Sequence, residues 1–175
     1  MTLQAVPADT VDADLFRQLL RLHAAAVVVI TAPGAPAEGA PATGFTATSF
    51  TSVSLDPPLV SFCLAKSASA WPAVEAADTV AVHVLGQEQE RVARTFSTRG
   101  IDRLAEHGAW QPGPDGVPLL DGVLARLVCR VVERVEAGDH TIVLASPLTG
   151  EHGLGEASAP LVYHSGRYVA LNHGE

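Results

Sequence analysis

The spacing of apolar residues along the chain predicts three amphipathic helices. In the first, leucine and phenylalanine recur every three or four residues, the period at which side chains return to one face of a helix. Asp12 or Asp14 stands where this helix needs an N-cap, and Ser67 or Ser69 would cap the second. Pro72 would then fall in the first turn of the second helix, where its missing N–H costs little. The helices are expected at Asp12–His23, Ser67–Ala77 and Gln87–Phe96.

Segments rich in β-branched residues, or alternating between apolar and polar residues, predict strands. The segment Leu124–Val135 is the most informative, because Arg126, Arg130 and Arg134 share one face of a strand there. Three arginines four residues apart would also suit a helix, but the valines and the Gly-Asp turn that follows favour a strand. The strands are expected at Ala26–Thr31, Gly44–Ser54 (with a turn), Leu59–Leu64, Thr79–Leu85, Leu124–Val135, His140–Leu148 and Pro160–Leu171.

Glycine and proline gather in two stretches that interrupt this pattern. We expect a flexible hairpin loop at Pro33–Pro41 and a loop throughout His107–Asp121. Because strands outnumber helices, the predicted fold is a mainly β barrel with a few flanking helices. The 175 residues suit a single domain over residues 1–175, with residues 1–11 as a flexible N-terminal tail.

Composition and charge exclude several functions. A net charge of −8 repels nucleic acid, and the aromatic residues (Phe 5, Trp 2, Tyr 2) are too few to stack single-stranded bases. The longest apolar stretch, Ala24–Ile30, is too short to cross a membrane, and the N-terminus has no signal-peptide pattern. We therefore expect a cytoplasmic protein that binds neither nucleic acid nor membrane. Cys63 and Cys129 lie in apolar runs, which predicts unpaired core residues.

Motifs of common enzyme classes are missing. The nearest approach to Gly-x-Gly-x-x-Gly, at Gly150–Gly155, has the wrong spacing for a dinucleotide fold, and Lys66 stands in no phosphate-binding loop. The histidines do not have metal-ligand spacing, and no serine stands in a nucleophile elbow. The sequence predicts neither a metal site nor a catalytic triad.

With these motifs excluded, the most informative segment is a run rich in hydroxyl side chains. Residues Thr43–Val60 read TGFTATSFTSVSLDPPLV, and Cys63–Ser69 read CLAKSAS. This run resembles the flavin reductase-like family, whose pattern is close to Thr-Ala-x-Ser-Phe-x-Ser-Val-Ser-x-Asp-Pro-Pro-Leu-Val. The resemblance spans about Leu19–Leu171, and its further segments come in the family's order: Pro118–Gly122, Cys129–Val132, Gly138–Ile142 and Pro160–Tyr168.

The resemblance implies a Greek-key-like, FMN-binding split β-barrel that passes a hydride from NADH or NADPH to FMN or FAD. Reduced flavin would go to a partner monooxygenase, and the chain would form a homodimer with its flavin sites near the subunit interface. The arginine-bearing strand gives the dimer separate support, since Val128 and Val132 make its arginine face half apolar. Two alternatives stay open: a split-barrel protein whose tightly bound flavin acts on a small molecule or corrin, and a non-catalytic flavin-binding module.

The resemblance also implies the residues of the site. His140 corresponds to the family's nicotinamide-side histidine and is the expected catalytic residue. Short hydroxyls suit the polar edge of a flavin, and serines at a helix N-terminus suit its phosphate. Thr48, where the family often has Asn or Ser, and Leu104, where it has Phe, leave the choice between FMN and FAD open. The expected flavin-binding residues are Thr46, Ala47, Thr48, Ser49, Ser52, Leu64, Ala65, Lys66, Ser67, Ser69 and Tyr168.

Overall fold

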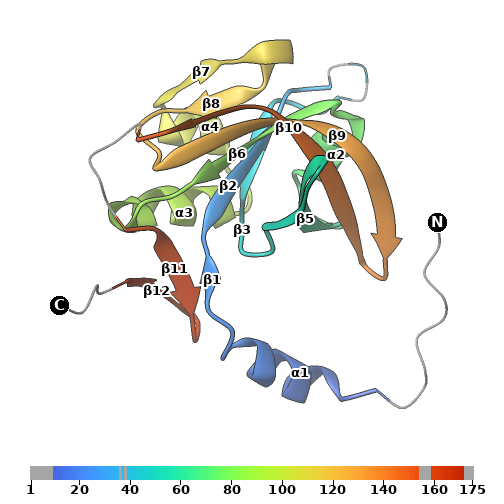
Figure 1. Cartoon of the computed structure of the whole chain (residues 1–175), viewed down its shortest axis with the longest axis vertical. Helices are drawn as coiled ribbons and strands as arrows, with labels where there is room; N and C mark the ends of the chain where they lie inside the picture. The colour runs from blue at the N-terminus through green and yellow to red at the C-terminus, as the bar shows by residue number, and fades with distance from the viewer. Residues whose placement is uncertain (1–9, 36, 38, 154–158, 172–175) are drawn as a thin grey trace.

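The computed structural model describes residues 10–35, 37, 39–153 and 159–171. Its main element is a seven-stranded antiparallel sheet in the order β3-β2-β6-β9-β10-β5-β4. The edge strands β3 (Thr43–Ala47) and β4 (Thr51–Leu55) are joined by residues 48–50 alone. Because so short a link spans at most about 14 Å, the sheet curves until its two edges lie close, as Figure 1 shows. The expected mainly β fold is confirmed, and the unpaired edges form a seam that we call the β3–β4 seam.

The inner strands follow the expected segments closely. Ladders join β2 to β3 and β6, and β5 to β4 and β10. The segment Ala26–Thr31 is divided between two sheets, because β1 pairs with β11 whereas β2 belongs to the large sheet. These strands are β1 (Ala25–Ala26), β2 (Val28–Ala32), β5 (Pro58–Ala65), β6 (Thr79–Val84), β9 (Ala125–Ala137) and β10 (His140–His152).

A bulge in β9 overturns the prediction of a single arginine face. Val131 pairs with Ala145 and Glu133 pairs with Leu144, so Val132 is an extra residue that reverses the alternation. Arg126 precedes the bulge and is only 9% exposed, which also contradicts the expected position on a surface that faces a second subunit. Arg134 follows the bulge, turns to the core face and donates to carbonyl oxygens of α2 and the residue after it.

The helices are partly as predicted. Helix α1 (Ala13–Leu20) is capped by Asp12, whose carboxylate accepts from two backbone N–H groups, and none of its residues is buried. In Figure 1, α1 lies apart from the large sheet, beyond the end of β1. The third expected helix is a 3₁₀ turn at Gln87–Gln89 followed by α3 (Glu90–Ser97).

The expected caps of the second helix are wrong. Helix α2 (Trp71–Ala76) begins four residues later than predicted, and no side chain caps it. Pro72 still lies in the first turn, so it marks the helix start where the serines do not. Ser69 instead accepts a hydrogen bond from Arg103, a residue of the unpredicted helix α4 (Arg103–His107).

The segment expected to be loop throughout contains a hairpin, so that prediction is wrong. Strands β7 (Trp110–Pro112) and β8 (Pro118–Leu120) pair around the 3₁₀ turn η3 (Pro114–Gly116). Glycine and proline therefore mark the turn and the ends of short strands here. The last predicted strand is likewise a hairpin, β11 (Leu161–His164) and β12 (Arg167–Ala170), which turns at Gly166 with φ +80°.

Two apolar clusters hold these layers together. The first fills the curve of the sheet around Phe62, Ile30 and Val143, with α2 covering one end. The second packs Phe96 of α3 against the other face. A Cβ at Gly44 would lie 2.7 Å from the Phe96 ring, so glycine is what allows α3 to approach β3 this closely.

The cysteines divide between two environments. Both are unpaired, and Cys129 is buried in the core, which raises the pKa of its thiol to about 12. Cys63 faces outward from β5 and is partly exposed, so the expectation of a core residue is wrong there. No helix in the part of the chain that the structure describes is long and apolar enough to cross a membrane.

Candidate functional site

Thr48, in the link between the edge strands, lines two adjoining cavities of about 560 and about 340 Å³. Tyr163 and Gly166 line both as well, so we treat the two cavities as one groove, the Thr48 groove. Arg17 and Arg21 line the first cavity, and Arg94 of α3 lines the second. The groove therefore combines cations, hydroxyls and aromatic rings beside the β3–β4 seam.

An aromatic pair forms one wall of this groove. The rings of Tyr163 and Tyr168 meet edge to face with centroids 5.2 Å apart, and the Arg94 guanidinium lies 5.2 Å from the centroid of the Tyr168 ring. Burial raises the pKa of Tyr168, so the phenol stays neutral at physiological pH. The wall offers an uncharged aromatic surface for a planar ring.

The link itself is fixed by Ser49. Its hydroxyl accepts from the Cys63 backbone N–H at 2.9 Å and lies 3.3 Å from the Cys63 carbonyl oxygen, which attaches the link to β5. Thr48, by contrast, has no hydrogen-bond partner among the described residues and is exposed in the groove. Of the two neighbouring hydroxyls, Thr48 has the one available to a ligand.

Other predicted flavin-binding residues are engaged elsewhere. The Thr46 hydroxyl donates to the Ala93 carbonyl oxygen at 2.6 Å, which anchors α3 on β3. The side chains of Ala47 and Leu64 are buried in the core, so only their backbone groups can face a ligand. Ser52 is exposed on β4, opposite Val60, and does not line the groove.

The structure gathers a second set of predicted residues where β5 leaves the sheet. His140 pairs with Ala65, and the Lys66 N–H donates to the Asp139 carbonyl oxygen at 3.0 Å. The Lys66 ammonium lies 3.1 Å from Glu136, so its charge already has a carboxylate partner. Ser67 follows in the turn and is exposed. Neither cavity of the Thr48 groove is lined by any of these residues.

His140 is oriented by its neighbour in the turn. Its Nδ1 lies 2.7 Å from the Asp139 carboxylate, and the hydrogen bond from His140 lowers the pKa of Asp139. Because a carboxylate can only accept, Nδ1 carries a proton, and Nε2 is free to accept when the ring is neutral. The ring is 46% exposed, so a ligand can reach it.

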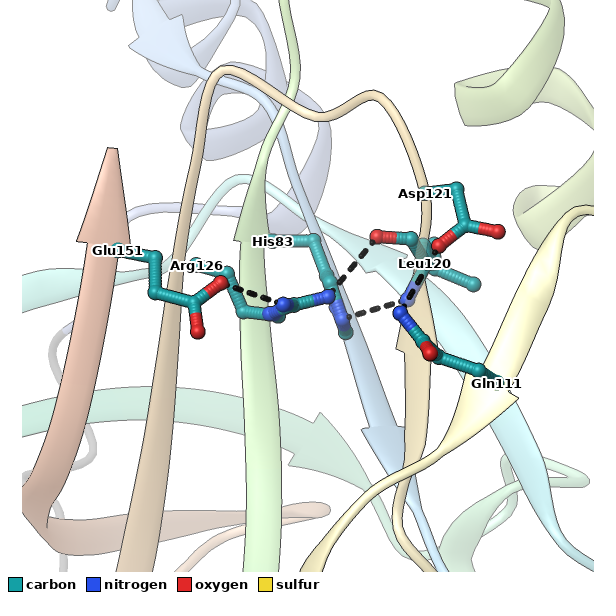
Figure 2. Close-up of polar contacts among 6 residues, drawn as sticks. All are labelled: His83, Gln111, Leu120, Asp121, Arg126 and Glu151. Atoms are coloured by element: carbon teal, nitrogen blue, oxygen red, sulfur yellow. Dashed lines mark hydrogen bonds and ion pairs between the residues drawn. The ribbon is translucent and has the colours of Figure 1, made fainter. Parts of the chain in front are cut away.

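Figure 2 shows a separate polar cluster, which centres on the buried side chains of His83 and Arg126. His83 is fully buried on β6, with Nδ1 3.1 Å from the Val29 carbonyl oxygen and Nε2 accepting from the Leu120 N–H at 3.1 Å. Burial lowers the pKa of His83 to about 3, so the ring is neutral. Arg126 donates to the Leu120 carbonyl oxygen at 3.4 Å and pairs with Glu151 at 2.5 Å. These contacts, which we call the His83 clamp, join β8 to the sheet.

The sequence prediction missed several residues that line the groove, among them Arg17, Arg21, Arg94, Tyr163 and Gly166. Tyr163 stands in a segment that resembles the family, which was a signal for it. Arg94 lies on the polar side of a predicted helix, where arginine is ordinary. Arg103 contacts residues far away in the sequence, such as Gly44 and Ser69, so no local pattern could reveal its burial.

Comparisons with known proteins agree with this architecture. The sequence matches the family described as "Flavin reductase like domain" over residues 20–172. It is 39% identical over 155 residues to the NADH:FMN oxidoreductase of Rhodococcus erythropolis, covering 87% of this chain and 79% of that protein. It is 32% identical over 169 residues to the reductase subunit HsaB of a flavin-dependent monooxygenase from Rhodococcus jostii, covering 95% and 82%.

Solved structures match over almost the whole chain. The NADH:FAD oxidoreductase SgcE6 of Streptomyces globisporus, in complex with NAD and FAD fragments, superposes with a TM-score of 0.82 at 34% identity. The match covers 95% of this chain and 98% of that one. A flavin reductase domain protein from Arthrobacter gives a TM-score of 0.83 at 33% identity, covering 94% and 98%. The chain has the split-barrel fold of these proteins and belongs to the flavin reductase-like domain family.

Proposed function

We propose that the protein is an NADH-dependent flavin reductase that transfers a hydride from NADH to FMN or FAD, acting as a single domain. The observation that carries this proposal is the 39% identity to an NADH:FMN oxidoreductase, which extends over 87% of the chain. Relatives of this similarity over nearly their full length usually share the reaction class. The similarity to a structure that holds NAD and FAD fragments supports both substrates.

The residues of the groove fit a flavin. A flavin has a polar edge of carbonyl oxygens and ring nitrogens, which the free Thr48 hydroxyl and nearby backbone N–H groups can bind. Tyr168 offers an aromatic surface next to them. When bound, the flavin is the acceptor of the hydride that NADH gives up. The protein's task is to orient and shield two planar rings, which requires no nucleophile or acid–base pair.

His140 is the residue that we assign to the nicotinamide side. Its Nδ1–H is held by Asp139, which leaves Nε2 as an acceptor that can bind a carboxamide N–H. The register places this ring beside Ala65 and therefore next to the turn at residues 66 and 67. We keep backbone groups of residues 64–67 as flavin contacts, and we do not assign the Lys66 charge to the ligand, because Glu136 pairs with it.

The reduced flavin is passed to a partner monooxygenase. The relative HsaB is named as the reductase subunit of such an enzyme, which supports this role. Gel filtration distinguishes the alternatives. A flavin that stays bound through the column, without turnover of free flavin, would favour an enzyme acting on a small molecule or corrin. Tight binding without any oxidation of NADH would favour a non-catalytic module.

We also propose that the protein is a homodimer. No residue of α1 is buried, so its apolar face is largely exposed, and further apolar side chains are exposed on the strands. Burial against a second copy would remove both surfaces from water, and a two-fold axis is the commonest arrangement. The exposed residues are Leu15, Phe16, Leu19, Leu20 and Leu22 at one end, and Val53, Leu55, Val132 and Leu148 on the sheet. Light scattering at micromolar concentration should give twice the chain mass of 18.2 kDa.

Steady-state kinetics test the reaction directly. Purified protein is mixed with NADH or NADPH and with FMN, FAD or riboflavin, and the loss of nicotinamide absorbance is followed. We expect turnover with NADH and with at least one of FMN and FAD. The absence of turnover in every pairing would overturn the proposed reaction.

A further inference from the structure

A cavity of about 630 Å³, which we call the β6 cavity, lies at the end of the large sheet where β2 ends and β6 begins. Its walls come from residues 33–35 after β2, the C-terminal part of α2, and the facing parts of β6 and β9. It shares no lining residue with the Thr48 groove and holds none of the residues expected to bind flavin. Ligand sites commonly measure about 300–1,000 Å³, so the β6 cavity has room for a small molecule.

Three charged residues of both signs line the β6 cavity: Asp78, Asp115 and Arg130. All three are exposed, and no ion pair joins Arg130 to either carboxylate. Arg130 also makes no hydrogen bond with its side chain to any residue that the structure describes. Opposite charges that line one cavity without pairing are available to a ligand that carries the complementary charges.

The strand pairing brings Arg130 and Asp115 to the same face of the sheet. Arg130 lies opposite Thr79 in the β6–β9 ladder, and residues directly opposite each other point to the same side. The buried Thr79 hydroxyl donates to Oδ2 of Asp115 at 2.7 Å. This bond holds the turn η3 against the start of β6 and leaves Oδ1 of Asp115 able to accept from a ligand.

Asp78 supplies the second carboxylate from a fixed backbone position. Its carbonyl oxygen accepts from the Val131 N–H at 2.8 Å, which attaches the end of α2 to β9. The carbonyl oxygen of Ala77, the residue before it, already accepts from Arg134. A cation that enters the cavity would therefore be bound by the two carboxylates and not by the end of the helix.

We propose that the β6 cavity binds a basic α-amino acid, such as lysine or arginine. Two carboxylates and one guanidinium are complemented by one carboxylate and two cationic groups, which is the charge pattern of a basic amino acid at neutral pH. The carboxylate of the ligand accepts from Arg130 in the bidentate geometry that a guanidinium favours. The α-ammonium and the side-chain cation donate to Asp78 and Asp115. This site does not depend on the proposed function.

NMR titration of isotope-labelled protein with three related ligands tests each charge separately. L-Lysine carries all three charged groups, L-norleucine lacks the side-chain cation, and 1,5-diaminopentane lacks the carboxylate. Because the three protein groups are exposed, we expect L-lysine to bind with a millimolar dissociation constant and to shift the amide signals of Asp78, Thr79 and Arg130. L-Norleucine and 1,5-diaminopentane should each bind about fivefold more weakly.

Substitutions of the three charged residues assign the contacts. Asp115→Asn keeps a side-chain oxygen that can accept from Thr79, and Asp78→Asn and Arg130→Gln change exposed side chains, so all three variants should fold. Arg130→Gln should weaken L-lysine about fivefold and leave 1,5-diaminopentane unchanged, since that ligand has no carboxylate. Each aspartate variant should weaken both ligands.

Arg91→Gln is the matched control. It removes an exposed arginine that lines neither the β6 cavity nor the Thr48 groove, so the affinity for L-lysine should stay the same. Flavin affinity should be unchanged in all four variants, because the β6 cavity and the groove share no residue.

Several outcomes would overturn the proposal. Equal binding of L-lysine and 1,5-diaminopentane would show a site for cations alone, and equal binding of L-lysine and L-norleucine would show that the side-chain cation has no partner. Unchanged amide signals at millimolar L-lysine, or no effect of Arg130→Gln, would exclude the β6 cavity as the site. Binding of L-lysine by a protein that oxidises no NADH would count against the proposed function alone.

Discussion

Two arginines, Arg126 and Arg103, are almost equally buried and differ in what surrounds them. Arg126 is 9% exposed and pairs with Glu151, while Arg103 is 8% exposed and contacts only neutral acceptors. The His83 clamp around Arg126 is therefore complete within the chain. The Arg103 region opens on a cavity and lacks a negative charge. A buried charge that lacks a charged partner is therefore the one that a ligand of opposite charge could compensate.

This contrast predicts that substitutions in the His83 clamp lower stability. Substitutions at ligand-accessible positions, such as His140 and Thr48, should instead weaken ligand binding. The largest effect on stability should come from lowering the pH. The folded pKa of His83 is about 3, against 6.5 for an ordinary histidine, so only the unfolded chain takes up a proton here as the pH falls below 6.5. Stability should therefore fall by roughly 1.4 kcal/mol per pH unit between those values. Urea unfolding at several pH values measures this slope.

Replacing His83 separates its contribution to the pH dependence of stability from the contributions of other titratable groups. His83→Leu keeps an apolar volume but leaves the buried Leu120 N–H without an acceptor, which should cost about 2 kcal/mol at pH 7.5. The acid slope should flatten in the same variant. Flavin affinity of the folded protein should not change. A large loss of flavin affinity at full stability would break the distinction between the two regions.

His140 provides the opposite case, an exposed histidine with a free ring nitrogen. His140→Ala should raise the KM for NADH about tenfold through loss of a hydrogen bond, while the midpoint of urea unfolding stays close to that of the wild type. The dissociation constant of the flavin should remain nearly the same. The reverse pattern, weak flavin binding at normal KM for NADH, would move His140 to the flavin side.

Of these changes, Thr48→Val should have the smallest effect, and that effect should be on flavin affinity. It removes a hydroxyl that has no partner in the described chain, so the fold loses nothing and the flavin loses one neutral hydrogen bond. We expect flavin binding to weaken about threefold, as measured by fluorescence quenching. Thr46→Val, two residues earlier on β3, is the control. Its hydroxyl anchors α3, so that variant should lose stability. Unaltered flavin affinity in Thr48→Val would exclude the hydroxyl as a ligand.

The sequence predicted what depends on near neighbours. The α1 cap at Asp12 and the β9–β10 hairpin at its Gly-Asp turn both follow from a few adjacent residues. The extra residue Val132 could not be predicted, because a bulge is defined by the partner strand and not by its own sequence. For the same reason the inward turn of Arg134 was missed.

The same limit applies to the candidate site, because the sequence indicated residues within one run but not the contacts between distant segments. A family-like run indicated Thr48 and Ser49, which do lie at the seam. Which hydroxyl is free depended on contacts with Cys63 and Ala93, which are distant in sequence. The helix expected to present Ser69 begins too late, and the partner of Ser69 comes from a helix of five residues that the pattern did not indicate.

The β3–β4 seam has a consequence for motion. No ladder hydrogen bond crosses it in the described sheet, so the two edges can separate without breaking the pairing on either side. Such an opening would stretch the bonds between Ser49 and Cys63 first, since these attach the link to β5. Backbone amides beside the seam should then exchange with deuterium sooner than those of β2 and β6. We therefore expect the seam, beside which the Thr48 groove lies, to be the part of the sheet that opens most readily.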